Sequence, residues 1–203
     1  QTNADVVLAL DASGSMQYGK EGITKFDYAK FTAASLAWLG RSQRDRVGLA
    51  FFDDTVKDFL APAVGRQSAL AHALSSARAH GVGSLEGGLT SLAARLNRRA
   101  VVVVVSDFYE PALTVVDALS TLRARGHEVI ALQVFDSAER HLGLAGTPVL
   151  RDMESGAQLP VVIDSVKDEY QAMLKAHTAA LEAGCGARGM DYILADTSMP
   201  LDA

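Results

Sequence analysis

Five consecutive valines stand in the stretch A-V-V-V-V-V-S-D, residues 100–107. Such a run leaves no polar face for water, which is typical of a strand buried on both faces in a parallel sheet. A second uninterrupted apolar run, V-V-L-A-L, covers residues 6–10 and is also followed by an acidic residue, Asp11. Since these are the most apolar strands predicted in the chain, we expect them at central, neighbouring positions of one sheet.

Strands and helices alternate along the rest of the chain. Further strands are predicted at residues 46–52, 56–60, 128–135 and 191–195, and helices at residues 25–39, 68–79, 85–96, 113–125 and 165 to about 184. The first of these helices is predicted to stop at Gly40. The alternation predicts an α/β fold with a doubly wound, mostly parallel sheet and helices on both faces.

Two departures from a purely parallel sheet are expected. The turn at Asp53-Asp54 is too short for a parallel crossover, so the strand at 56–60 is predicted to be one antiparallel edge strand. Residues 149–153 and 158–162, joined around Glu154-Ser155-Gly156, are predicted to form a small β-hairpin insertion.

Length and composition limit the class of protein. The chain has 203 residues, 49% hydrophobic and 21% charged, which fits one ordinary domain over residues 1–203. A net charge of −5 with scattered basic residues argues against nucleic acid as a partner. No apolar run approaches the roughly 20 residues that span a bilayer, and the single cysteine, Cys185, fits a cytoplasmic location. Because the first strand begins almost at the N-terminus, the chain is predicted to be a fragment of a longer protein.

The stretch D-A-S-G-S, residues 11–15, follows the first apolar strand directly. It puts one carboxylate and two hydroxyls into a tight turn at the carboxyl end of a buried strand, where open α/β sheets bind ligands. Asp107 follows the valine-rich strand and should lie beside Asp11, Ser13 and Ser15 if the two strands are neighbours. Such hard oxygen donors suit Mg²⁺, Mn²⁺ or Ca²⁺ rather than zinc or copper, and Mg²⁺ is the preferred prediction.

Simpler and different interpretations of this motif exist. Asp and Ser are also the favoured residues of turns and helix N-termini, which is compatible with metal binding. An Mg²⁺-dependent phosphohydrolase or phosphoacceptor domain would use Asp11, but haloacid-dehalogenase-like enzymes carry D-x-D here, and Ser13 removes the second carboxylate that acts as acid and base. A serine hydrolase is disfavoured because the chain has no G-x-S-x-G motif.

Several further stretches resemble segments of a known protein family. These stretches are K-F-D-Y-A-K-F-T-A-A-S-L-A (25–37), D-R-V-G-L-A-F-F (45–52), V-V-V-V-V-S-D-F (101–108), R-D-M-E-S-G (151–156) and A-D-T-S-M-P-L (195–201). Together with D-x-S-x-S they resemble von Willebrand factor A-like domains, and more narrowly the bacterial "domain of unknown function 58" family. The similarity runs from about Asp5 to Leu201. It implies a metal-ion-dependent adhesion site and a noncatalytic domain.

In that family two serines and a threonine of a second loop bind the ion directly, while the aspartates bind it directly or through water. The resemblance therefore implies Ser13 and Ser15 as direct ligands, with Asp11 and Asp107 holding the ion and its waters. Ser84 stands where the family usually has threonine, and Thr90 is the competitor. Ser84 is favoured because it leaves room for a helix of about three turns before the valine-rich strand, whereas Thr90 would leave only a stub.

The resemblance also implies a function and partners. A sixth ligand position would accept an Asp or Glu carboxylate of a partner protein. Genes of this family commonly lie beside genes for MoxR-type AAA+ ATPases. The resemblance therefore implies that the protein acts together with such an ATPase in protein maturation or assembly. Members of the family carry an additional N-terminal segment, so the full-length protein is expected to be longer than this chain. In some members that segment contains membrane helices, and such a segment would anchor the protein in a membrane.

Overall fold

The computed structural model describes residues 4–19, 22–141, 149–151, 158–160 and 163–199 of the chain. The strands are β1 (Asp5–Asp11), β2 (Arg46–Phe52), β3 (Val56–Ala63), β4 (Val101–Ser106), β5 (Glu128–Phe135), β6 (Val149–Arg151), β7 (Gln158–Pro160) and β8 (Asp191–Asp196). The helices are η1, a short 3₁₀ helix (Gly14–Gln17), α1 (Lys25–Gln43), α2 (Gln67–Ser76), α3 (Leu85–Arg95), α4 (Ala112–Ala124), α5 (Ser137–His141) and α6 (Ile163–Ala187).

Six of the strands form one sheet in the order β3-β2-β1-β4-β5-β8. The strand β1 pairs in parallel with β2 on one side and with β4 on the other, and β5 and β8 continue the parallel sheet. The edge strand β3 is antiparallel to β2. These pairings confirm the predicted α/β fold, the neighbouring central strands and the antiparallel edge.

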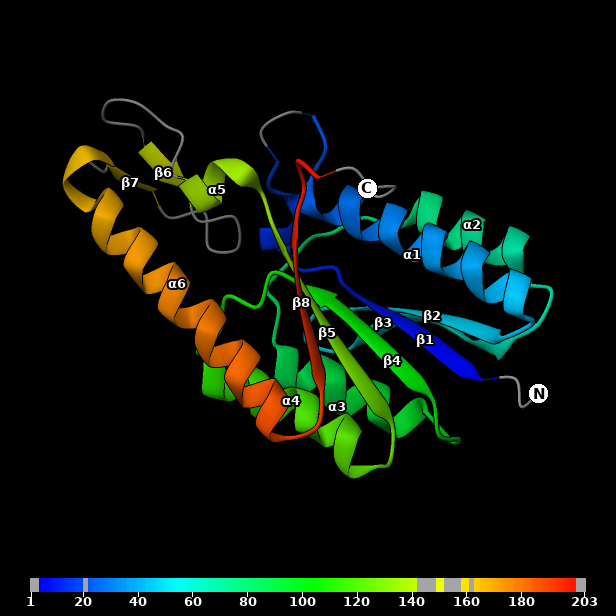
Figure 1. Ribbon diagram of the computed structural model, residues 1–203. Helices are drawn as coiled ribbons and strands as arrows, with labels where there is room; N and C mark the ends of the chain where they lie inside the picture. Colours follow the sequence, from blue (N-terminus) through cyan, green and yellow to red (C-terminus); the bar gives the residue numbers. More distant parts are fainter. Residues whose placement is uncertain (1–3, 20–21, 142–148, 152–157, 161–162, 200–203) are drawn as a thin grey trace.

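Helices cover both faces of the sheet (Figure 1). Val102 and Val104 point into a core formed with α3, α4 and α6, whereas Val103 and Val105 point into a second core formed with α1 and α2. Successive side chains of a strand alternate between the two faces of a sheet. The valine run is therefore apolar throughout because each of its faces packs against its own helical layer.

Two helices differ from the sequence-based expectation. The helix α1 does not stop at Gly40 but continues to Gln43 and ends at Arg44, whose φ of 62° is left-handed. Gly40 is buried, and a Cβ at this position would lie 2.7 Å from Cγ2 of Val47. The glycine therefore allows α1 to pack closely on β2. The helix α5 was not predicted, because five residues are too few for a helical periodicity.

The predicted hairpin lies apart from the main sheet. The strands β6 and β7 pair with each other in an antiparallel arrangement, as expected, and the predicted turn at residues 154–156 lies outside the described residues. Within the described ranges, no helix has both the length and the apolar character that a membrane crossing requires.

Candidate metal centre

The carboxyl ends of β1 and β4 bring two predicted site residues together. Leu10 pairs with Val105, so Asp11 and Asp107 leave neighbouring strands at the same edge of the sheet. Both side chains are buried. The Ser106 hydroxyl donates a hydrogen bond of 2.6 Å to Oδ2 of Asp11 and accepts one of 3.1 Å from the backbone N–H of Phe108. Ser106, which was not predicted as a site residue, thus joins the two loops.

The D-A-S-G-S turn gathers its own polar groups. The backbone N–H of Ser13 donates to Oδ1 of Asp11 over 2.8 Å, which bends the chain sharply after β1. The hydroxyl oxygens of Ser13 and Ser15 are 3.2 Å apart, and Ser13 is buried while Ser15 is half-buried. The turn therefore holds one carboxylate and two hydroxyls at the edge of the sheet.

The loop that leads to Ser84 contacts this turn, and the assignment of Ser84 rather than Thr90 as the second-loop ligand stays a prediction. The loop before α3 contacts the turn through a hydrogen bond of 2.9 Å from the N–H of Gly14 to the carbonyl of Gly81. Ser84 is the N-cap of α3, and the first N–H of that helix, from Leu85, donates to Oε1 of Glu110 over 2.8 Å. Thr90 is exposed in the second turn of α3. We call Asp11, Ser13, Ser15, Ser84 and Asp107 the candidate metal centre.

The electrostatics of the candidate metal centre favour a cation. Burial and the charge of Asp107 raise the pKa of Asp11 to about 7, although Ser106 and Ser13 donate hydrogen bonds to its carboxylate. The hydrogen bonds to Asp11 therefore do not fully compensate the burial of its negative charge beside Asp107. Carboxylate and hydroxyl oxygens are the donors that hard divalent cations prefer, so this set fits Mg²⁺, Mn²⁺ or Ca²⁺. Among the residues described, no group of three or more His, Cys, Asp or Glu side chains could hold a metal.

A buried lysine also lies at this edge of the sheet. Lys25 is the first residue of α1, its side chain is fully buried, and its Nζ is 2.8 Å from Oδ2 of Asp107 and 3.1 Å from Oε1 of Glu139. The start of α1 is fixed by a capping box in which Thr24 and Asp27 bond each other's backbone N–H groups. A lysine at the positive N-terminus of a helix is unfavourable by itself. A lysine in the first turn of a predicted helix is therefore the sequence feature that marks Lys25, which is absent from the predicted site residues.

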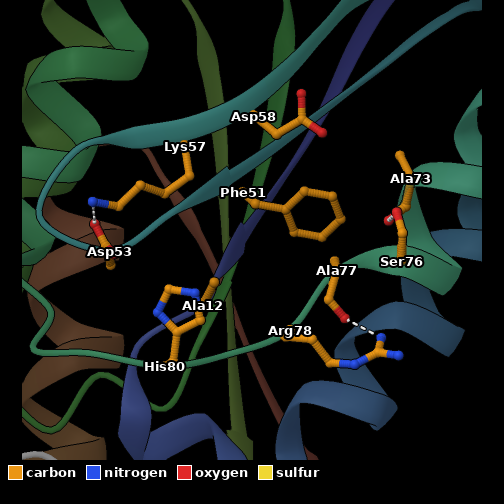
Figure 2. A pocket seen from close by; sticks show the side chains of 10 residues that line it. All are labelled: Ala12, Phe51, Asp53, Lys57, Asp58, Ala73, Ser76, Ala77, Arg78 and His80. Carbon is orange, nitrogen blue, oxygen red and sulfur yellow. Dashed lines mark hydrogen bonds and ion pairs between the residues drawn. The ribbon is translucent and has the colours of Figure 1, made fainter.

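A pocket of about 230 Å³ flanks the D-A-S-G-S turn (Figure 2). It is lined by Ala12, Phe51, Asp53, Lys57, Asp58, Ala73, Ser76, Ala77, Arg78 and His80. Lys57 reaches across to Asp53 in an ion pair of 2.9 Å, and the backbone N–H of His80 donates to the carbonyl of Ala12 over 2.8 Å. The pocket thus adjoins the turn on the side of β2 and β3, and its walls include neither Asp11 nor Asp107.

Replacing the serine that joins the two loops should destabilise the protein. In the Ser106→Ala variant, Oδ2 of the buried Asp11 loses its hydroxyl donor, which should lower the free energy of unfolding by about 1–3 kcal/mol. Urea unfolding in chelator at pH 8 measures this. Ser42→Ala is the control, because the Ser42 hydroxyl bonds only the exposed carbonyl of Leu39 within its own helix. Equal stability of the Ser106 variant and the wild type would contradict the assigned bond.

Comparison with known proteins gives sequence relatives without an assigned activity. The model of the family described as "Protein of unknown function DUF58" matches residues 1–180. An uncharacterised protein of Mycobacterium tuberculosis is 29% identical over 189 residues, covering 89% of this chain and 59% of that protein. The chain therefore spans less than two thirds of the length of this relative.

Solved structures share the fold at low sequence identity. BatB from Bacteroides thetaiotaomicron has a TM-score of 0.61 at 17% identity, covering 97% of this chain and 92% of the other. The SpRpn10 VWA domain has a TM-score of 0.53 at 11% identity, covering 98% and 92%. Manganese-loaded TRAP of Plasmodium vivax has a TM-score of 0.50 at 14% identity, covering 96% and 68%. The fold of the chain is that of the VWA domains.

Proposed function

The chain belongs to the DUF58 family, and from this membership, its VWA-like fold and its candidate metal centre we propose that it is a noncatalytic protein–protein interaction module that depends on a divalent cation. The observation that carries the proposal is the convergence of Asp11, Ser13 and Ser15 with Asp107 at the carboxyl ends of β1 and β4. This edge of a parallel sheet is where α/β proteins bind ligands.

Each residue of the candidate metal centre has a proposed role. Ser13, Ser15 and Ser84 supply neutral hydroxyl ligands, and Asp11 and Asp107 hold the ion directly or through water. Mg²⁺ is the preferred ion, and Mn²⁺ and Ca²⁺ are the alternatives. The TRAP structure, which shares this fold, is described as manganese-loaded, and this supports Mn²⁺ among the candidate ions.

The ligand set leads to a mode of recognition. Because the hydroxyl ligands are neutral, the bound ion keeps much of its positive charge. An octahedral ion with these donors has room for one more oxygen ligand, and an Asp or Glu carboxylate of a partner protein supplies the strongest one. From the family resemblance of the sequence, we propose that the protein works with a MoxR-type AAA+ ATPase in protein maturation or assembly.

The alternative of an Mg²⁺-dependent phosphohydrolase has less support. Both carboxylate oxygens of Asp11 accept hydrogen bonds, Oδ1 from Ser13 and Oδ2 from Ser106, and these bonds make Asp11 a poor nucleophile. The position two residues later is a serine, so the second carboxylate of a D-x-D motif is absent from the turn.

Calorimetric titration of the chelator-treated protein with Mg²⁺, Mn²⁺ and Ca²⁺ tests the proposal. We expect saturable binding of one ion per chain. Ser84→Ala should weaken it by at least roughly tenfold, the loss that follows even from removing an outer-shell partner. Thr90→Ala is the matched control and should bind like the wild type.

Two outcomes would contradict the proposed function. Absence of binding for all three ions would remove the metal-dependent mode of recognition. Metal-dependent hydrolysis of p-nitrophenyl phosphate that disappears in the Asp11→Asn variant would instead favour the phosphohydrolase. Equal binding by Ser84→Ala with a loss in Thr90→Ala would reassign the second-loop ligand to Thr90.

A further inference from the structure

The buried ammonium of Lys25 is held from several sides. Besides Asp107 and Glu139, its Nζ lies 3.4 Å from the hydroxyl of Tyr109 and 4.4 Å from the centre of the Tyr109 ring. The ring of Tyr18 is 5.9 Å away on another side. Three segments distant in sequence, the N-terminus of α1, the loop after β4 and the helix α5, therefore meet at one positive charge.

Stability alone gives a poor account of this lysine. Burying an ammonium costs desolvation free energy, and replacing a buried ion pair by apolar side chains is often neutral or stabilising. Its place at the N-terminus of α1 adds an unfavourable interaction with the helix dipole. This lysine shares the carboxylate of Asp107 with the candidate metal centre.

The charges at this edge balance only when the lysine is counted. Asp107 and Glu139 share the ammonium of Lys25, and Asp11 lies near Asp107, so three ionised carboxylates and one ammonium leave two negative charges at this end of the sheet. Without Lys25 the negative charge near the ion would be larger, and it would repel an approaching carboxylate more strongly. The lysine offsets that excess at the carboxylate that the ion shares with it.

We propose that Lys25 supplies a permanent positive charge beside the candidate metal centre. This charge weakens binding of the divalent ion in the absence of a partner, and it strengthens binding of the partner's carboxylate to the loaded ion. This inference rests on the proposed function. A fixed positive charge repels the incoming cation and attracts the incoming anion by the same Coulomb law, so the two effects have opposite signs.

The test measures the two affinities separately. Mn²⁺ is titrated into the chelator-treated protein by calorimetry, and acetate is then titrated into the Mn²⁺-loaded protein while paramagnetic broadening of its methyl resonance is followed. In Lys25→Met, Mn²⁺ should bind at least tenfold more tightly and acetate severalfold more weakly. A unit charge roughly 4 Å away changes the affinity for another unit charge by about fivefold at the dielectric constant of water and by more at lower values, and the change is larger for a divalent ion.

A second variant keeps the test valid if Lys25→Met does not fold. Glu139→Gln retains the Lys25–Asp107 pair and removes one negative charge, so Mn²⁺ should bind more weakly and acetate more tightly. Lys30→Met is the matched control, because Lys30 also lies in α1 but pairs with Asp27 away from the candidate metal centre. Its two affinities should equal those of the wild type.

The outcomes separate the two proposals. A purely structural lysine predicts that both affinities fall together or stay unchanged in both variants, and either result would overturn the role of Lys25 while leaving the metal site in place. If the wild type binds no Mn²⁺, the proposed function fails and this inference fails with it.

Discussion

The Asp11→Asn variant should be more stable than the wild-type protein at pH 8 in the absence of metal, although it should lose the proposed binding of a divalent cation. Burial and the charge of Asp107 raise the pKa of Asp11 from 3.8 to about 7 in the folded protein. Between these two values the folded state binds more protons than the unfolded state, so the free energy of unfolding falls as the pH rises. Above pH 7 the folded wild type carries the full cost of the charged carboxylate, about 4 kcal/mol for a pKa raised from 3.8 to about 7.

The asparagine avoids this cost with little loss of hydrogen bonding. Its Oδ1 can still accept from the N–H of Ser13, and its amide N–H can donate to the Ser106 hydroxyl, which accepts as well as donates. Unfolding by urea in chelator should therefore show the variant more stable than the wild type at pH 8 and more stable by a clearly smaller margin at pH 5, because the wild type loses stability progressively between pH 3.8 and about 7. Asp58→Asn, a change at an exposed carboxylate of β3, is the control and should leave the stability at both pH values unchanged.

Added metal should offset most of the stability difference at pH 8. Excess Mn²⁺ stabilises whatever folded protein binds it, by about 2.7 kcal/mol at a concentration one hundred times the dissociation constant. The wild type should gain this stability and Asp11→Asn should gain none. If the variant is less stable than the wild type in chelator at both pH values, burial and the charge of Asp107 do not destabilise the Asp11 carboxylate.

The second large effect concerns the close packing of α3 on the sheet. A Cβ at Gly88 would lie 2.9 Å from the carbonyl oxygen of Asp53 and closer still to Cδ2 of the Phe52 ring. Gly88→Ala should therefore push α3 away from β2 and lower the free energy of unfolding by about 3 kcal/mol, the upper end of the usual cost of overpacking. Since Ser84 caps this helix, metal binding should weaken as well.

Gly186→Ala is the matched control for this substitution. No atom lies within 4 Å of a Cβ built at Gly186, which is in α6, so alanine should stabilise the protein by up to about 1 kcal/mol through helix propensity. Replacing Phe52 by leucine in the Gly88→Ala background should recover part of the lost stability. Equal unfolding free energies for Gly88→Ala and the wild type would mean that α3 lies farther from β2 than described.

Much of the fold could be predicted from the sequence because hydrophobic patterns report directly on burial. The valine run predicted a central strand, and its two faces do pack on separate helical layers. The stop predicted at Gly40 was wrong because the same residue type that ends helices also allows close helix–sheet contact, and only the position of Val47 distinguishes the two.

At the candidate metal centre, too, some residues could be predicted from the sequence and others could not. Asp11, Ser13, Ser15 and Asp107 follow directly from apolar strands, so the topology of a parallel sheet is enough to expect them together. Lys25 and Glu139 come from helices whose approach to the loop after β4 depends on tertiary packing. No local pattern marks a pair that forms across 114 residues of chain.

The pairing of β1 with β4 also sets the order of events during synthesis. The Ser106–Asp11 bond joins residues that are 95 positions apart, and a loop of that length must close before the bond can form. A nascent chain that has emerged only as far as α3 contains β1, β2 and β3 but none of β4. The proposed metal site therefore stays incomplete until β4 has joined β1, and binding of a divalent cation at this site would mark chains that have completed this step.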